Sequence, residues 1–171
     1  MLQGRWPNPL TLDAKNRFAL PARVRDGLLE KDAKELMVGV LQEPCLYLHN
    51  EVQHHRFLDR TFRHLGETRE SRKLKTYIIS RFVPVNTDSQ GRITIPQLLL
   101  ERAGIKKEVV LLAQDSRIEL WPTEELDRLE AEAQSGSLDD ALERVFAEEQ
   151  EEQRLLRRAV GPTGEGEVPS R

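Results

Sequence analysis

The apolar and polar positions of this chain form an arrangement that occurs twice. Residues 11–21 carry Asp, Arg and Pro at set positions within an alternation of apolar side chains, and residues 86–96 repeat these features 75 positions later. Two further alternating runs follow each segment, near 36–41 and 46–49 in the first copy and near 108–113 and 117–121 in the second. Alternation of this kind is typical of half-buried strands. The pattern therefore predicts two copies of one unit of about 40 residues.

The downstream parts of the two copies can be aligned with each other. Met37–Gln42 matches Val109–Gln114, and Leu46–Leu48 matches Ile118–Leu120, each pair 72 positions apart. A unit of about 40 residues rarely sustains a hydrophobic core alone. We therefore expect the two copies to share one core, as a compact pseudo-symmetric β-barrel surrounded by helices.

A tight turn is predicted near the start of each copy, at residues 13–17 and 88–92. Asn16 and Gly91 occupy the same place in these turns, and both residue types tolerate a positive φ. The apolar positions on either side of each turn predict a β-hairpin. Its second strand is expected to end at a proline, Pro21 or Pro96.

Helices are predicted between and after these strands. Residues 22–29 and 97–103 follow the two prolines, which favour the first turn of a helix, and Gly104 ends the second. Between the copies we expect a helix over 50–65, ended by Gly66, and another over 71–80. The first places Phe57, Leu58, Phe62 and Leu65 on one face.

Further helix starts are expected after the second copy, at 122–125 and 137–140. The latter helix would carry an apolar stripe formed by Leu138, Leu142, Val145 and Phe146. Residues 161–171 are rich in glycine and proline and are predicted to be a disordered tail.

Composition narrows the class of protein. Apolar residues make up 38% and charged residues 32% of the 171 residues, which is enough to bury a core. The single cysteine excludes an intramolecular disulfide and any multi-cysteine metal site, so nothing indicates an oxidising compartment. No apolar run approaches the roughly 18 residues of a membrane span, and no signal-peptide stretch opens the sequence. We expect a cytoplasmic protein with no membrane partner.

The net charge of −3 conceals an asymmetry along the chain. Residues 1–107 hold 19 Lys and Arg against 12 Asp and Glu, whereas residues 108–171 hold 7 against 17. A basic first part and an acidic extension are expected when one region meets phosphate and the other is kept away from it or is simply solvated.

No group of residues indicates an enzyme. The four histidines, His49, His54, His55 and His64, lie near the linker helix without a metal-ligand spacing, and we expect them on the solvated surface. Cys45 is expected to be a small buried residue rather than a nucleophile. Neither a phosphate-binding loop nor a dinucleotide-binding glycine motif occurs. We therefore predict no catalytic residues, no metal and no cofactor.

The repeated Asp-x-x-x-Arg motif has two interpretations. In the structural one, Asp13 and Asp88 bind turn amides and pair with Arg17 and Arg92. In the functional one, the loop presents arginine to phosphate or to the O6 and N7 atoms of guanine. The first copy is the more basic, with a charge of +3 over 13–25, and we expect it to form the main nucleic-acid face. The candidate DNA-binding residues are Lys15, Arg17, Arg23, Arg25 and Arg92.

These motifs resemble those of a known family. The stretches Asp-Ala-Lys-Asn-Arg-Phe-Ala-Leu-Pro and Asp-Ser-Gln-Gly-Arg-Ile-Thr-Ile-Pro are followed by Arg-Ala-Gly-Ile, Lys-Glu-Val-Val-Leu and Arg-Ile-Glu-Leu-Trp. Over roughly residues 1–130 the chain closely resembles the bacterial MraZ family, whose two repeats belong to the SpoVT/AbrB class of swapped-hairpin DNA-binding domains. The functional arginine of that family corresponds to Arg17, and its counterpart in the second copy to Arg92.

The resemblance implies an α+β fold built as a duplicated, pseudo-symmetric swapped-hairpin β-barrel with surrounding helices. The repeats are expected at 7–51 and 80–123, with a helical linker at 52–79. A helical acidic extension would follow at 124–160, and the disordered tail at 161–171. The role of the acidic extension is left open.

The resemblance also implies a function. Such a protein would be a transcriptional regulator in the cytoplasm and nucleoid, binding direct repeats upstream of the division and cell-wall gene cluster as a homo-oligomeric ring. Its partners would be double-stranded DNA and further copies of itself. Two alternatives stay open: an AbrB-type antitoxin that uses the barrel for DNA and its C-terminal segment for a toxin, and a structural ring that does not bind DNA.

Overall fold

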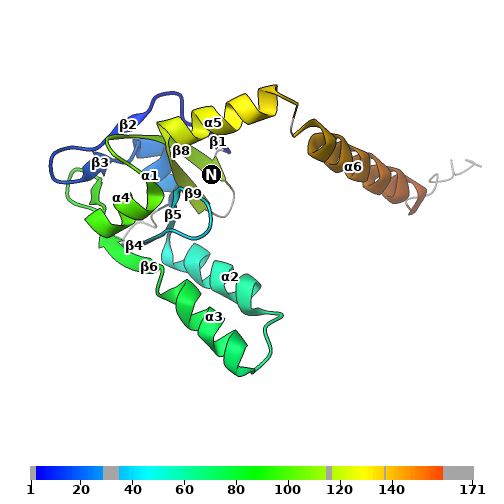
Figure 1. Cartoon of the computed structure of the whole chain (residues 1–171), viewed down its shortest axis with the longest axis horizontal. Helices are drawn as coiled ribbons and strands as arrows, with labels where there is room; N and C mark the ends of the chain where they lie inside the picture. Colours follow the sequence, from blue (N-terminus) through cyan, green and yellow to red (C-terminus); the bar gives the residue numbers. More distant parts are fainter. Residues whose placement is uncertain (1–2, 29–34, 115–116, 137, 160–171) are drawn as a thin grey trace, which may run out of the picture. The chain divides into compact units, whose positions relative to one another are not determined.

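The computed structural model of the chain describes residues 3–28, 35–114, 117–136 and 138–159 (Figure 1). The chain divides into two compact units, Met1–Asp127 and Arg128–Arg171. The strands of the described residues all lie in the first unit, together with four complete helices. The fold is therefore α+β, as the sequence predicts.

The strands are short and all pair in antiparallel fashion. Among the described residues they are β1 (Gly4–Arg5), β2 (Leu10–Thr11), β3 (Arg17–Ala19), β4 (Glu35–Gly39), β5 (Leu46–His49), β6 (Phe82–Asn86), β7 (Arg92–Thr94), β8 (Glu108–Gln114) and β9 (Arg117–Pro122). One sheet runs in the order β1-β8-β9-β5-β4-β6, with β2 also paired to β8, and β3 and β7 form a separate two-stranded ribbon.

The predicted hairpins are wrong in their pairing partners, although the turns occur where the sequence places them. The strand before the first turn, β2, pairs with β8, and the strand after it, β3, pairs with β7. In the second copy β6 pairs with β4, and the turn is spanned by an isolated bridge between Thr87 and Ile93 rather than by a strand pair. The reason is that neither copy buries its own apolar faces, so strands of one copy are covered by strands of the other.

The exchange between the copies is reciprocal. The Leu20 amide donates to the Gly91 carbonyl at 3.1 Å, and the Ile95 amide donates to the Asn16 carbonyl at 2.9 Å. These four residues are equivalent in pairs, 75 positions apart. The ribbon is centred on Phe18 opposite Ile93. Equivalent residues of the two copies therefore make equivalent hydrogen bonds to the opposite copy.

The sequence alignment of β4 with β8 must be shifted by one residue. In the hairpins of β4 with β5 and of β8 with β9, Val38 lies opposite Leu48 and Leu111 lies opposite Leu120. Val38 is therefore equivalent to Leu111, 73 positions later, and Met37 is not equivalent to Val109. Because side chains alternate between the two faces of a strand, the slip of one residue would exchange the core face for the opposite face.

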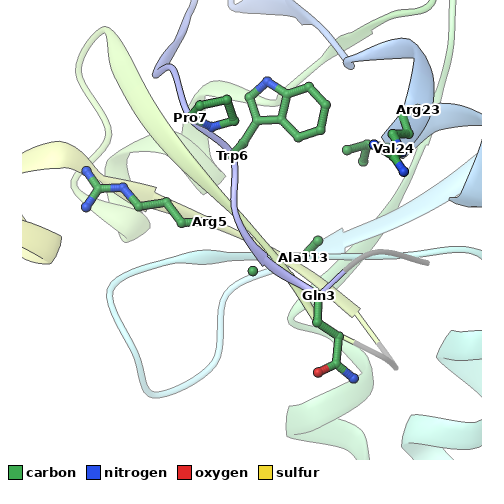
Figure 2. A pocket seen from close by; sticks show the side chains of 8 residues that line it. Gln3, Arg5, Trp6, Pro7, Arg23, Val24 and Ala113 are labelled. Carbon is green, nitrogen blue, oxygen red and sulfur yellow. The ribbon is translucent and has the colours of Figure 1, made fainter.

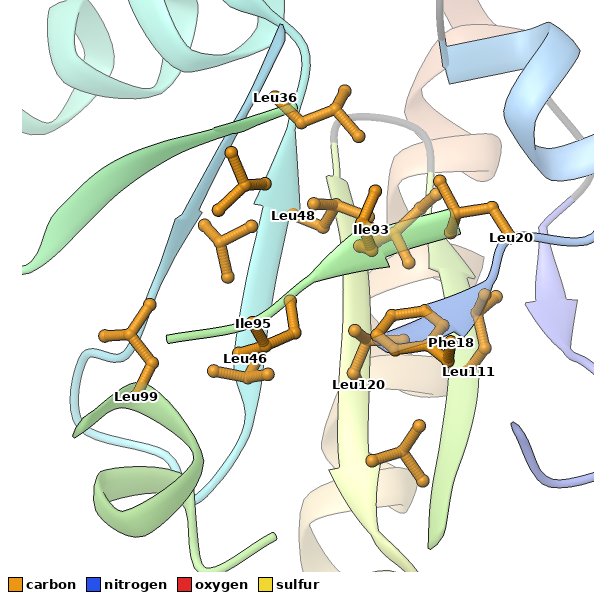
Figure 3. Packing of buried hydrophobic residues seen from close by; sticks show 14 of the residues in the cluster. Phe18, Leu20, Leu36, Leu46, Leu48, Ile93, Ile95, Leu99, Leu111 and Leu120 are labelled. Carbon is orange, nitrogen blue, oxygen red and sulfur yellow. The ribbon is translucent and has the colours of Figure 1, made fainter. Parts of the chain in front are cut away.

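The main core draws on both copies. Its buried side chains include Leu36, Leu46, Leu48, Ile93, Ile95, Leu111 and Leu120, several of them completely inaccessible, and Figure 3 shows them packed between strands of the two copies. A smaller cluster around Cys45, Tyr47, Phe82 and Trp121 packs separately from it. Strand β5 is buried along its whole length because it lies between β4 and β9.

The short helices after the turns are confirmed as α1 (Ala22–Leu28) and α4 (Gln97–Ala103). Gly104 ends α4 with a φ of 70°, as its position predicts. The linker forms α2 (Glu51–Phe62) and α3 (Arg69–Ile79). Helix α2 ends before Gly66 because Arg63 already caps it, and α3 begins two residues earlier than expected because the Thr68 hydroxyl accepts from the Ser71 amide.

The last helices are α5 (Thr123–Gln134) and α6 (Asp139–Ala159). Along α6, Leu142, Val145 and Phe146 are 48%, 59% and 56% exposed, so the predicted apolar stripe is uncovered. The predicted disordered tail, 161–171, lies outside the described residues. Within the described residues, no helix has the length and apolar character to cross a membrane.

Candidate nucleic-acid interface

The first turn, residues 13–17, is organised around one carboxylate. Asp13 Oδ1 accepts hydrogen bonds from the amides of Lys15 at 2.8 Å and Arg17 at 3.0 Å. Its Oδ2 accepts from Arg17 Nε at 2.8 Å and lies 2.7 Å from Nη2. The Asp13 amide donates to the Arg17 carbonyl and so closes the turn.

The second turn, residues 88–92, has the same construction. Asp88 Oδ1 accepts from the amides of Gln90 and Arg92, both at 2.9 Å, and Oδ2 accepts from Arg92 Nε at 2.7 Å. The structural interpretation of the repeated motif is therefore confirmed in both copies. Asn16 and Gly91 have φ values of 58° and 71°, as the turn prediction requires.

Both carboxylates are held in the charged form. The hydrogen bond from the Arg17 guanidinium is the largest cause that lowers the pKa of Asp13 to about 2. The same pair raises the pKa of Arg17. At Asp88, the amide of Arg92 is the largest cause of a lowered pKa. Each turn therefore keeps its ion pair and its shape throughout the neutral pH range.

The ribbon of β3 and β7 places both arginines on one face. Arg17 lies opposite Thr94 and Arg92 opposite Ala19, while the central pair, Phe18 and Ile93, is buried. Successive side chains of a strand point to opposite faces, so Arg17 and Arg92 share the outer face of the ribbon. Between the copies, Asn16 Nδ2 also donates to Gln97 Oε1 at 2.9 Å.

Two of the remaining basic candidates, Arg23 and Arg25, lie on opposite sides of helix α1. Arg25 lies against the second turn, since a Cβ at Gly91 would collide with its Nη1. Arg23, two residues earlier, is on the opposite side of the helix and lines a pocket with Trp6. Lys15 is exposed in the first turn. The structure thus brings Lys15, Arg17, Arg25 and Arg92 to the two turns and leaves Arg23 apart from them.

The histidine prediction is half wrong. His55 and His64 are exposed as expected, but His49 and His54 are 1% and 8% exposed. Their Nδ1 atoms lie 3.4 Å apart, and the His49 ring stacks on Phe82. Burial lowers the pKa of His49 to about 3 and also lowers that of His54. The apolar run Cys45–Leu48 directly before His49 is the sequence signal that could have placed this histidine inside.

The remaining chemical candidates are structural. Cys45 is completely buried, as predicted, and burial raises the pKa of its thiol to about 12, which makes it a poor nucleophile. Glu119 is a buried carboxylate that sequence reasoning missed. It accepts from Arg117 Nε at 2.6 Å and Trp121 Nε1 at 2.9 Å. The described residues contain no group of three or more side chains suited to a metal ion.

Comparison with known proteins gives consistent matches. The model of a family described as "MraZ protein, putative antitoxin-like" matches residues 79–149, which extends from the second copy into α6. A protein of Thioalkalivibrio sulfidiphilus named Transcriptional regulator MraZ is 33% identical over 112 residues, covering 66% of this chain and 75% of the relative.

Two further relatives carry the same name. The protein of Hydrogenovibrio crunogenus is 31% identical over 129 residues, covering 74% of this chain and 84% of the relative. The protein of Azotobacter vinelandii is 33% identical over 119 residues, covering 68% and 78%. The matches therefore extend over most of both partners and are not confined to the second copy.

Proposed function

The chain belongs to the MraZ family, and on this premise we propose that it is a transcriptional regulator that binds double-stranded DNA. The DNA would be direct repeats upstream of the division and cell-wall gene cluster, read in the nucleoid. No step of this function requires catalysis.

The observation that carries the proposal is the shared outer face of the β3–β7 ribbon. Arg17 and Arg92 both stand on it, each fixed by an aspartate that also fixes the backbone of its turn. A guanidinium has five N–H donors, so pairing with one aspartate oxygen leaves donors for phosphate or guanine. Because the aspartates already hold the side chains in place, DNA binding would lose little side-chain entropy.

We assign the DNA contacts to Lys15, Arg17, Arg25 and Arg92. The first copy contributes three of the four, in keeping with its more basic composition. Arg23 is left out of this set because it lies on the other side of α1 from Arg25.

The reciprocal strand exchange supports a duplicated swapped-hairpin arrangement closed as a barrel. We propose repeats at 7–51 and 80–123, joined by a helical linker at 52–79 and followed by a helical acidic extension at 124–160. We also propose that copies of the chain form a ring, so that several protomers contact successive DNA repeats. Exposed apolar side chains on the linker helices, namely Val52, Leu74, Tyr77 and Ile79, are available for such contacts.

The matched family description contains the word antitoxin-like, which favours one rival. In that rival, the protein would bind DNA with its strands and a toxin with its C-terminal segment. The uncovered apolar stripe of α6 would suit that role. Against it, AbrB-type antitoxins usually carry one repeat per chain, whereas this chain carries two. Both readings share DNA binding, and the structural ring without DNA does not.

A binding titration with the chain's own upstream region tests the proposal. We expect saturable binding whose logarithmic affinity falls linearly with the logarithm of salt concentration, with a slope of about −0.9 for each phosphate neutralised. A scrambled duplex of equal length is the control and should bind more weakly at every salt concentration. Equal affinity for both duplexes, or affinity independent of salt, would contradict the proposal.

A further inference from the structure

A pocket of about 300 Å³ lies between the N-terminal strand and helix α1, away from the two turns. Figure 2 shows the Trp6 ring extending from the strand toward Val24 and Arg23 of α1, with Ala113 of β8 beneath. The side chain of Arg5 leads away from this group. Since β1 and β2 run along β8 from Ala113 to Glu108, the pocket and the Asp13 turn lie at opposite ends of that strand.

The lining of the pocket combines apolar side chains with arginine. Trp6, Pro7, Val24 and Ala113 supply apolar area, and the described residues that line the pocket include no carboxylate although the chain has 29 Asp and Glu. Arg23 is exposed, and its side chain has no hydrogen-bond or ion-pair partner among the described residues. A pocket lined by an exposed guanidinium and by an indole ring suits an anion that also has a flat apolar part.

We propose that this pocket binds a small planar aromatic molecule that carries one anionic group. The aromatic ring would stack against Trp6 over Val24 and Ala113, and the carboxylate or phosphate would pair with Arg23. The volume is at the lower end for ligand sites, which limits the ligand to about the size of a nucleoside monophosphate. Arg23, which is not among the proposed DNA contacts, would thus serve to bind the anionic group of this ligand.

Helix α1 connects this pocket to the second turn. Arg23 and Val24 line the pocket, and Arg25 lies against Gly91. A ligand that holds Arg23 would therefore bind to the same helix whose Arg25 lies against the second turn, and could change how that turn meets DNA. This step rests on the proposed function, whereas ligand binding itself does not. By reciprocity, the ligand and DNA would change each other's affinity by the same factor.

Calorimetric titration of the full chain with two probes, AMP and indole-3-acetate, tests the site without DNA. At least one probe should bind saturably at one site per chain, and adenosine, which lacks the anion, should bind more weakly than AMP. Arg23→Gln should weaken binding of that probe by about tenfold, the value of one lost charged hydrogen bond. The matched control is Arg102→Gln, an exposed arginine on α4, which should have no effect.

Two results would overturn the site: no saturable binding of either probe, or equal affinity in Arg23→Gln and the unchanged chain. Ala113→Leu, which fills the pocket and leaves Arg23 in place, should also abolish binding in a protein with an unchanged circular dichroism spectrum. The coupling is tested by repeating the DNA titration with the saturating probe. Unchanged DNA affinity would refute the coupling through α1, and loss of DNA binding without the probe would refute only the proposed function.

Discussion

One carboxylate in each turn fixes both the backbone and the functional side chain. Asp13 binds two amides with one oxygen and the Arg17 guanidinium with the other, and Asp88 does the same for Arg92. The structural and functional interpretations of the motif are therefore compatible, because the ion pair that closes the turn also holds the arginine in one orientation. A lysine at these positions would lack the planar fork and would be held less firmly.

Replacement of the two arginines should separate their contributions. Arg17→Ala removes a contact from the more basic copy in every protomer that touches a DNA repeat, so we expect operator affinity to fall by well over about tenfold through multivalency. Arg92→Ala should reduce it less. Circular dichroism and sizing chromatography should show the same fold and assembly for both variants. Affinity that survives Arg17→Ala, or falls further with Arg92→Ala, would move the DNA face to the second copy.

The positive φ of Asn16 predicts how substitutions at this position change stability. Asn16→Gly should be tolerated, because Gly91 holds the equivalent position at a similar φ. Asn16→Val should lower the free energy of unfolding by about 1–3 kcal/mol, because a β-branched side chain is strained at φ near 60°. Thermal melting of the two variants measures the difference. Equal melting temperatures would show that the turn relaxes to another conformation.

At the scale of elements, α2 is joined to the sheet by an aromatic and imidazole cluster. His54 and Phe57 of the helix contact His49 of β5 and Phe82 of β6, with ring centroids 4.8–5.7 Å apart. Arg60 and Arg117 add positive charge near His49, which disfavours its protonation further. The attachment of the linker to the strands therefore requires a neutral histidine pair.

Acid should weaken this attachment. The folded pKa of His49 is lowered to about 3, whereas an unfolded histidine titrates near 6.5. The unfolded state therefore binds the extra proton first, and stability is lost as pH falls below about 6.5, by up to about 1.4 kcal/mol per pH unit. Urea unfolding between pH 7 and pH 4 measures the slope. His49→Phe should reduce the dependence of stability on pH, whereas the exposed-site control His64→Gln should leave it unchanged. Identical slopes in both variants and the unchanged chain would contradict a role for His49.

At the scale of the whole molecule, the positions of the elements could be predicted from the sequence better than the pairing of the strands. The turns, α4 and the four downstream strands follow from alternation, glycine and proline, which act within a few residues. The partners of β2 and β3 do not, because a strand of two or three residues carries too little pattern to select one neighbour. The partner of β6 does not either, because alternation along its five residues indicates a strand but not which strand lies beside it. His49 was misplaced because its burial depends on α2 and β6, which come from other parts of the chain and lie over it.

The same long-range pairing decides which residues meet at the candidate sites. Arg17 and Arg92 belong to motifs visible in the sequence, but only the β3–β7 register places them on one face. Arg23 and Arg25 are close in sequence, yet the turn of α1 sends them to different places. Counting charges along the sequence therefore identified the basic region. It could not show which of its arginines lie at the turns and which lie elsewhere.

The reciprocal hydrogen bonds between the copies determine how folding depends on the concentration of the protein. A single copy would leave the edges of β3 and β4 unpaired and could satisfy them only by capturing a second copy from solution, which becomes rare on dilution. Tethering the copies by the linker replaces that encounter with an intramolecular one at a fixed effective concentration of the order of millimolar. The folded unit therefore persists in a cell that contains only a few molecules of it, whatever its state of higher assembly.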